Sequence, residues 1–183
     1  MRRFIQSSVC LLVVLGLSAD LAATTARRLT NRDLAETAEA IAIGTVSGVR
    51  TAWEGRMLVT VATVTVRETL KGSIGGTIAV ALPGGIDANR RFPVAMTYAG
   101  APTMKPGEEV FLFLAQDEAV TSGFTVLGFS QGKFSIVQDA SGRQLVSRDL
   151  TTLNLQTGTG IVPGTLTLAS LSEFRQEILS YVQ

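Results

Sequence analysis

The side chains that carry most enzymatic chemistry are absent from this sequence or occur only once. The chain of 183 residues contains no histidine, and its one cysteine is Cys10. Catalytic triads and imidazole acid/base catalysis depend on these residue types, and zinc and copper sites use them as ligands. The remaining chemistry is that of carboxylate, Lys, Ser and Tyr side chains, so the sequence predicts a non-catalytic protein with no metal and no cofactor.

Two adjacent carboxylate pairs, Glu108-Glu109 and Asp117-Glu118, are the first candidates for that remaining chemistry. Neighbouring side chains on a strand point to opposite faces, so neither pair converges by itself. We interpret both as solvated turn charges, with acid/base catalysis or Ca²⁺ binding as the alternative. Asp139 opens an Asp-Ala-Ser-Gly turn, where a carboxylate typically accepts hydrogen bonds from backbone amides.

Lys71 precedes Gly72 after a Val-rich strand, and we interpret it as a rim charge, with a reactive amine as the alternative. Phe124, Phe129 and Phe134 could stack bases or sugars on a barrel surface. Packing in the core is the favoured interpretation, because few cations accompany them. Neither Gly-rich segment has the spacing of a phosphate loop.

The charge balance argues against polyanionic partners. The formal net charge is +1, and removal of Arg2, Arg3 and Asp20 with a leader leaves cations and anions equal in number. A neutral chain with scattered charges offers no electrostatic footprint for nucleic acid or an anionic membrane. We therefore expect a protein partner and no nucleic acid.

Residues 86–104 are the least regular stretch of the sequence, and they predict a long loop with a short strand near residues 92–98. Long loops on a rigid scaffold often carry binding function. The candidate binding surface consists of polar, cationic, aromatic and thioether side chains from this stretch: Asp87, Asn89, Arg90, Arg91, Tyr98 and Met104.

Residues 1–23 have the order of a signal peptide. Arg2 and Arg3 precede an apolar run over residues 9–17, and small residues follow. Cleavage is expected after Ala23 or Ala26. The run is about half of the ~20 residues that a spanning helix needs, so we expect no stable membrane insertion and export to the periplasm or medium. The mature chain would then contain no cysteine.

Residues 29–183 are predicted to form one domain. A helix over residues 29–40, capped by Thr30 with Asp33, and an amphipathic helix over residues 170–182 flank a run of strands. The Val-rich strand at residues 57–66 and its neighbour at 77–82 organise the others. The further strands are expected at residues 40–49, 109–115, 124–129, 133–138 and 143–148, with a turn at 53–56 and a polar loop or arm at 149–167.

This pattern predicts a mainly β, α+β fold: a small OB-like antiparallel β-barrel with both helices packed on one side. The helix leading into Ala-Ile-Ala-Ile-Gly-Thr-Val, the strand closing on Leu70-Lys71-Gly72, and Pro106-Gly107-Glu108-Glu109-Val110 carry a family resemblance. Over residues 33–137 the chain resembles the netrin-like (tissue inhibitor of metalloproteinase) type of OB-fold barrel and bacterial secreted proteins of uncharacterised function. Those inhibitors chelate a protease zinc through an amino-terminal Cys, whereas this mature chain would begin at Thr24 or Arg27.

Three functions follow from these observations. The favoured one is an exported, non-catalytic β-barrel module that binds a protein partner, with a secreted protease as one candidate. A carboxylate-dependent hydrolase of cell-wall or extracellular glycan is an alternative that needs two converging carboxylates. A structural envelope or matrix component is the other alternative, and an exposed apolar patch on residues 86–104 would favour partner binding over it.

Overall fold

Five strands close into a small barrel in the computed structural model, which describes residues 25–116 and 123–182. Hydrogen bonding runs around the ring in the order β2, β3, β4, β8, β7 and back to β2, and every pair is antiparallel except β4 with β8. This ring confirms the predicted OB-like barrel. Its strands are β2 (Ala40–Glu54), β3 (Met57–Lys71), β4 (Thr77–Pro83), β7 (Glu109–Gln116) and β8 (Gly123–Val126).

The hairpin of β2 and β3 is longer than the sequence predicted. β2 continues to Glu54, so that Trp53 lies opposite Leu58 and only Gly55 and Arg56 form the turn. The register of β2 with β3 shifts around Gly44 and Gly48, and such irregularities bend a strand. At Gly44 the strands approach so closely that an added Cβ would lie 2.4 Å from the Thr65 carbonyl oxygen.

Strand β7 separates two hydrophobic cores, which explains its nearly continuous apolar sequence. Val110, Leu112 and Leu114 point into the barrel, where they pack with residues of β3 and β4. Phe111 and Phe113 point to the other face and pack with both helices. The strand predicted at residues 109–115 is thereby confirmed, and it is central to the fold.

Beyond the barrel, the sheet continues through β9 (Lys133–Gln138), β10 (Gln144–Asp149) and β13 (Leu166–Ser170). β8 and β9 share one edge of β7: β8 pairs with its last three residues and β9 with its first four. β8 and β9 run in the same direction along this edge, and between them residues 127–132 leave the edge of β7 in a turn, so the strand predicted over residues 124–129 is wrong at its end. Phe129 instead begins the 3-10 turn η1 (Phe129–Gly132), with the only positive φ of a non-glycine residue in the described chain, 66°.

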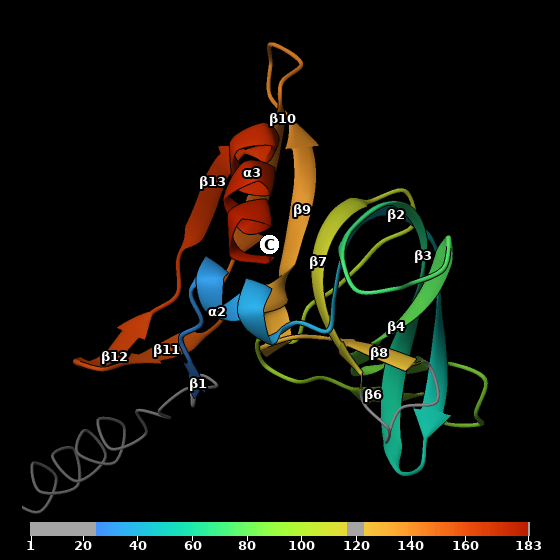
Figure 1. Cartoon of the computed structure of the whole chain (residues 1–183). Coiled ribbons are helices and arrows are strands. Elements are labelled where there is room, and N and C mark those ends of the chain that lie inside the picture. The colour runs from blue at the N-terminus through green and yellow to red at the C-terminus, as the bar shows by residue number, and fades with distance from the viewer. Residues whose placement is uncertain (1–24, 117–122, 183) are drawn as a thin grey trace, which may run out of the picture.

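Two helices cover the same face of this sheet extension (Figure 1). Helix α2 (Asn31–Thr37) has the predicted capping box, in which Thr30 and Asp33 exchange hydrogen bonds. Helix α3 (Leu171–Val182) buries Leu171, Phe174 and Ile178, as its periodicity predicted. Neither helix has the length and apolar character needed to cross a bilayer.

The polar segment that follows β10 was predicted to be a loop or an arm. It contains regular strands as well. It forms β11 (Asn154–Thr157) and β12 (Gly160–Pro163), and β1 (Thr25–Arg27) joins them in a small separate sheet. Within residues 86–104 the predicted short strand is present as β6 (Val94–Met96), but its partner β5 (Gly85–Asp87) was missed. Strands of three or four residues are too short to produce a periodic pattern.

Candidate binding groove

Residues 96–104 form one wall of three adjoining hollows on the barrel and its sheet extension. The apolar hollow has a volume of 340 Å³, the loop hollow 560 Å³ and the polar hollow 280 Å³. Tyr98 and Pro102 line both the apolar and the loop hollow, and Thr103 and Thr152 line both the loop and the polar hollow. The hollows share lining residues and therefore adjoin one another, and we call the three together the groove, which is apolar at one end and polar at the other.

The apolar hollow is built on β3, β4 and β8. Side chains of Leu58, Val59, Leu82 and Val126 supply buried apolar surface, and Met57 and Tyr98 are exposed at the edge. The face of an OB barrel formed by its second and third strands is a common location for ligands, and those strands correspond to β3 and β4 here.

The strained residue Phe129 also lines the apolar hollow. A bulky residue at positive φ costs free energy and persists only where the surroundings hold it. Gln131, which is 1% exposed, holds this turn in place, and we call it the clamp of the turn. Its side chain accepts a hydrogen bond from the Leu29 amide at 2.8 Å and donates one to the Arg27 carbonyl at 2.9 Å.

Asp87 organises the polar residues of the predicted binding surface. Its carboxylate accepts hydrogen bonds from the Trp53 indole (2.8 Å), the Arg90 guanidinium (3.1 Å) and the Asn89 backbone amide (3.1 Å). The Arg90 guanidinium also lies over the Trp53 ring, 4.6 Å from its centre. The hydrogen bond from Trp53 is the main reason that the pKa of Asp87 lies below its usual value. This carboxylate therefore stays charged at neutral pH, which suits a binding rim better than acid catalysis.

The other predicted surface residues lie in three different places. Arg91 stacks on the ring of Phe92, which is 74% exposed. Tyr98 is partly exposed between the apolar and the loop hollow. Met104 is 5% exposed and belongs to the barrel core, so its side chain is a buried wall of the loop hollow and its placement on an exposed surface was wrong.

The polar hollow contains functional groups that sequence reasoning did not single out. Lys133 Nζ donates hydrogen bonds to Glu108 and, at 2.9 Å, to the Ser135 hydroxyl, which in turn donates to Glu108 at 2.7 Å. Burial raises the pKa of Glu108, but the hydrogen bonds from Lys133 and Ser135 outweigh it and hold this pKa below the usual value. The sequence feature that could have revealed this cluster is the spacing of Lys133 and Ser135, which places both side chains on one face of a strand.

The paired carboxylates diverge, as their positions on a strand predicted. Glu108 turns to Lys133, and Glu109 pairs with Arg67 at 2.9 Å. Asp117-Glu118 lies outside the described residues. Lys71 donates to the Ala35 and Glu36 carbonyls at 2.8 Å each, which caps the end of α2. Among the described residues no three His, Cys, Asp or Glu side chains are grouped to hold a metal ion.

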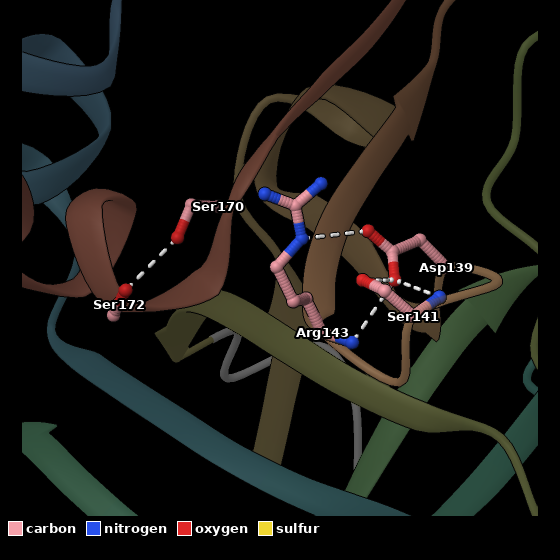
Figure 2. Close-up of polar contacts among 5 residues, drawn as sticks. All are labelled: Asp139, Ser141, Arg143, Ser170 and Ser172. Carbon is pink, nitrogen blue, oxygen red and sulfur yellow. Dashed lines mark hydrogen bonds and ion pairs between the residues drawn. The ribbon is translucent and has the colours of Figure 1, made fainter.

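The Asp139 carboxylate holds its turn together by hydrogen bonds, as the sequence predicted (Figure 2). One carboxylate oxygen accepts hydrogen bonds from the Ser141 amide and hydroxyl and from the Arg143 amide, and the other accepts from Arg143 Nε at 2.9 Å. The Ser141 hydroxyl is the donor to an ionised acid, so the group is a turn clamp and offers no base for a nucleophile.

We predict that this clamp fails in acid. The hydrogen bond from Ser141 is the largest of the contributions that lower the pKa of Asp139 to about 2 from 3.8. Its stabilising contribution is therefore complete above about pH 4 and is lost as the pH falls toward about 2. Urea unfolding should show Asp139→Asn to be less stable than the wild type at neutral pH, with the difference shrinking toward about pH 2. A difference that stays constant with pH would contradict this account.

The structure defines the class as a small OB-like barrel with a helix-covered sheet extension and a groove along its longest loop. No protein-family model matches the chain, and no curated protein is significantly similar to it.

Proposed function

We propose that the protein is an exported, non-catalytic binding module whose groove holds an extended segment of a protein partner. The observation that carries the proposal is the pair of apolar and loop hollows, which share Tyr98 and Pro102 and open beside exposed apolar side chains. A centre of buried apolar surface with a polar rim is the usual anatomy of a protein interface. The polar groups nearest to it are those of the Asp87–Arg90–Trp53 cluster, which adjoins Ile86 of the loop hollow.

Residues 86–104 supply apolar surface to the partner. Ile86 is 64% exposed, Phe92 74% and Tyr98 39%. Ile86 and Tyr98 both line the loop hollow, and exposed apolar side chains gathered in one place favour a binding surface. They support a protein partner over a purely structural envelope or matrix component.

The positions of the acids argue against the glycan hydrolase. A hydrolase of this type needs two carboxylates that converge across the scissile bond. Beside the groove, Asp87 is held by Arg90 and Trp53, and Glu108 by Lys133. These two carboxylates are each neutralised by a cation, and Asp149 is the only acid among the residues that line the three hollows, so no second carboxylate converges with it there.

Export follows from the amino-terminal sequence, which lies outside the described residues. Cleavage after Ala23 would keep β1 whole, whereas cleavage after Ala26 would remove two of its residues. Because β1 pairs with β11, the mature terminus would not project as a wedge. A secreted protease therefore remains one candidate partner, bound through the groove and not through the terminus.

Site-specific photocrosslinking in the producing cells tests this proposal. A benzophenone side chain at position 98 or 57 should crosslink to the same partner, whereas one at position 176, on the exposed face of α3, should not. With the crosslinked protein purified, Tyr98→Ala should weaken its binding by ~30-fold, because a central aromatic anchor contributes about 2 kcal/mol or more.

Gln176→Ala is the matched control and should leave the affinity unchanged. Equal crosslinking at positions 98 and 176 would overturn the proposal. So would an affinity that Tyr98→Ala leaves intact.

A further inference from the structure

We propose that the polar hollow binds a neutral, polyhydroxylated ligand the size of one sugar ring. The hollow has a volume of 280 Å³, at the small end of the roughly 300–1,000 Å³ range of ligand sites. Ligand binding here needs no protein partner in the apolar hollow, so this inference goes beyond the proposed function.

The side chains of the hollow lie in register on two paired strands. Lys133 and Ser135 lie on one face of β9, and Ser147, directly opposite Ser135, lies on β10 with Asp149 two residues further. The opposite face carries Phe134, Ile136 and Val146, which are packed under the helices. Rigid strands therefore hold the four polar side chains, which is the arrangement that favours a preformed site.

Ser130 lines the same hollow and carries an unpartnered hydroxyl. Ser130 is 9% exposed, and its oxygen is buried without a hydrogen-bond partner among the described residues. A buried polar atom in this state costs about 1–3 kcal/mol, so it calls for an explanation. The strained Phe129 and the clamped Gln131 on either side hold Ser130 at this position.

The remaining hydrogen-bonding capacity of the hollow selects the ligand class. Lys133 has three N–H groups and uses two of them on Glu108 and Ser135, which leaves one donor. One Asp149 oxygen accepts from Thr151, which leaves the other as an acceptor. Hydroxyls complete the lining: Ser130, Ser135, Ser147, Thr103 and Thr152.

Charge excludes the obvious ionic ligands. Glu108 already neutralises Lys133, and Asp149 adds a further negative charge, so an anion such as phosphate would meet net repulsion. A metal cation would find only one carboxylate among the lining residues, that of Asp149. Alternating donors and acceptors around a small cavity instead match the hydroxyls of a sugar, which both donate and accept hydrogen bonds.

Titration calorimetry of the intact protein tests this inference. The probes are D-glucose, D-galactose, N-acetyl-D-glucosamine, myo-inositol and chitobiose, with inorganic phosphate as the anionic comparison. We expect at least one sugar or inositol probe to bind with a Kd of about 10 mM or tighter, and phosphate not to bind. Tighter binding of chitobiose than of the monosaccharides would point to glycan ends as the source, and equal binding to free sugars.

Two conservative variants locate the site. Ser130→Ala and Ser147→Ala should each weaken binding of the best probe by about fivefold, the effect of one lost hydrogen bond. Ser141→Ala, on the exposed hairpin turn, is the matched control and should leave sugar binding unchanged. Retained binding in both Ser130→Ala and Ser147→Ala would overturn the inference, as would phosphate binding or a hollow that takes up water only.

Discussion

Replacing Phe111 with Ala should destabilise the protein by about 3–5 kcal/mol, the range for a fully buried phenyl ring. Phe111 is 0% exposed, and its ring contacts those of Phe113, Phe134 and Phe174 at centre distances of 5.4, 6.4 and 5.0 Å. These rings join β7, β9 and α3, so the truncation leaves a cavity where the helix meets the sheet. Aromatic pairs of this geometry add to the cost beyond the buried area alone.

Urea unfolding followed by far-UV circular dichroism measures this effect. Phe92→Ala is the matched control: that ring is 74% exposed, and the free energy of unfolding should change by less than ~0.5 kcal/mol. If Phe111→Ala does not fold at all, Phe111→Leu should still be destabilised, though by less. Equal stability of the Phe92 and Phe111 variants would show that the aromatic cluster is not a core.

Gln131→Ala should cost about 1–3 kcal/mol, because it removes two partly buried hydrogen bonds to the backbone, each of which contributes about 0.5–1.5 kcal/mol. The side chain joins the strained turn η1 to the amino-terminal segment through Leu29 and Arg27. Truncation therefore releases both partners at once. The turn that presents Phe129 to the apolar hollow and Ser130 to the polar hollow would lose its support.

Hydrogen exchange separates this local effect from a general loss of stability. In Gln131→Ala the amide of Leu29 should exchange faster than in the wild type under native conditions, while amides in β7 keep their protection. Gln176→Ala, on the exposed face of α3, should change neither measurement. Unchanged exchange at Leu29 would mean that Gln131 does not act as the clamp.

The two variants also bear on the groove in different ways. Phe111 stabilises the interface between helices and sheet, on the face of β9 opposite the polar hollow. Gln131 positions the turn between two hollows. A variant that keeps its stability but no longer binds ligand therefore reports on the groove itself. Ser147→Ala is the variant best suited to this test, because the Ser147 hydroxyl makes no hydrogen bond within the described chain.

Local rules were sufficient for much of the fold. The Thr30–Asp33 capping box, the apolar stripe of α3 and the Asp139 turn each depend on residues within a few positions of one another. The apolar run of β7 predicted a central strand because burial on both faces removes the polar alternation. Such signals are present in any short window of the sequence, and so they could be read directly.

The candidate site was less accessible to the same reasoning. The irregular stretch at residues 86–104 does line the hollows, but Met104 is part of the core and Arg91 points to Phe92. Ser130, Lys133 and Ser147 were not singled out. Their common location depends on the pairing of β9 with β10, and nothing in the spacing of a single segment states that register.

By itself, the sequence determined the fold class, the capped start of α2 and the absence of imidazole chemistry, because residue type and near-neighbour periodicity control all three. Only the tertiary structure decided that β8 and β9 share one edge of β7 and that Phe129 bends the chain between them. That choice depends on which distant strands find each other. Which strands pair depends on the hydrogen bonds and the buried surface that residues far apart in the sequence can form together. This pairing places the polar hollow next to the loop hollow and the apolar hollow.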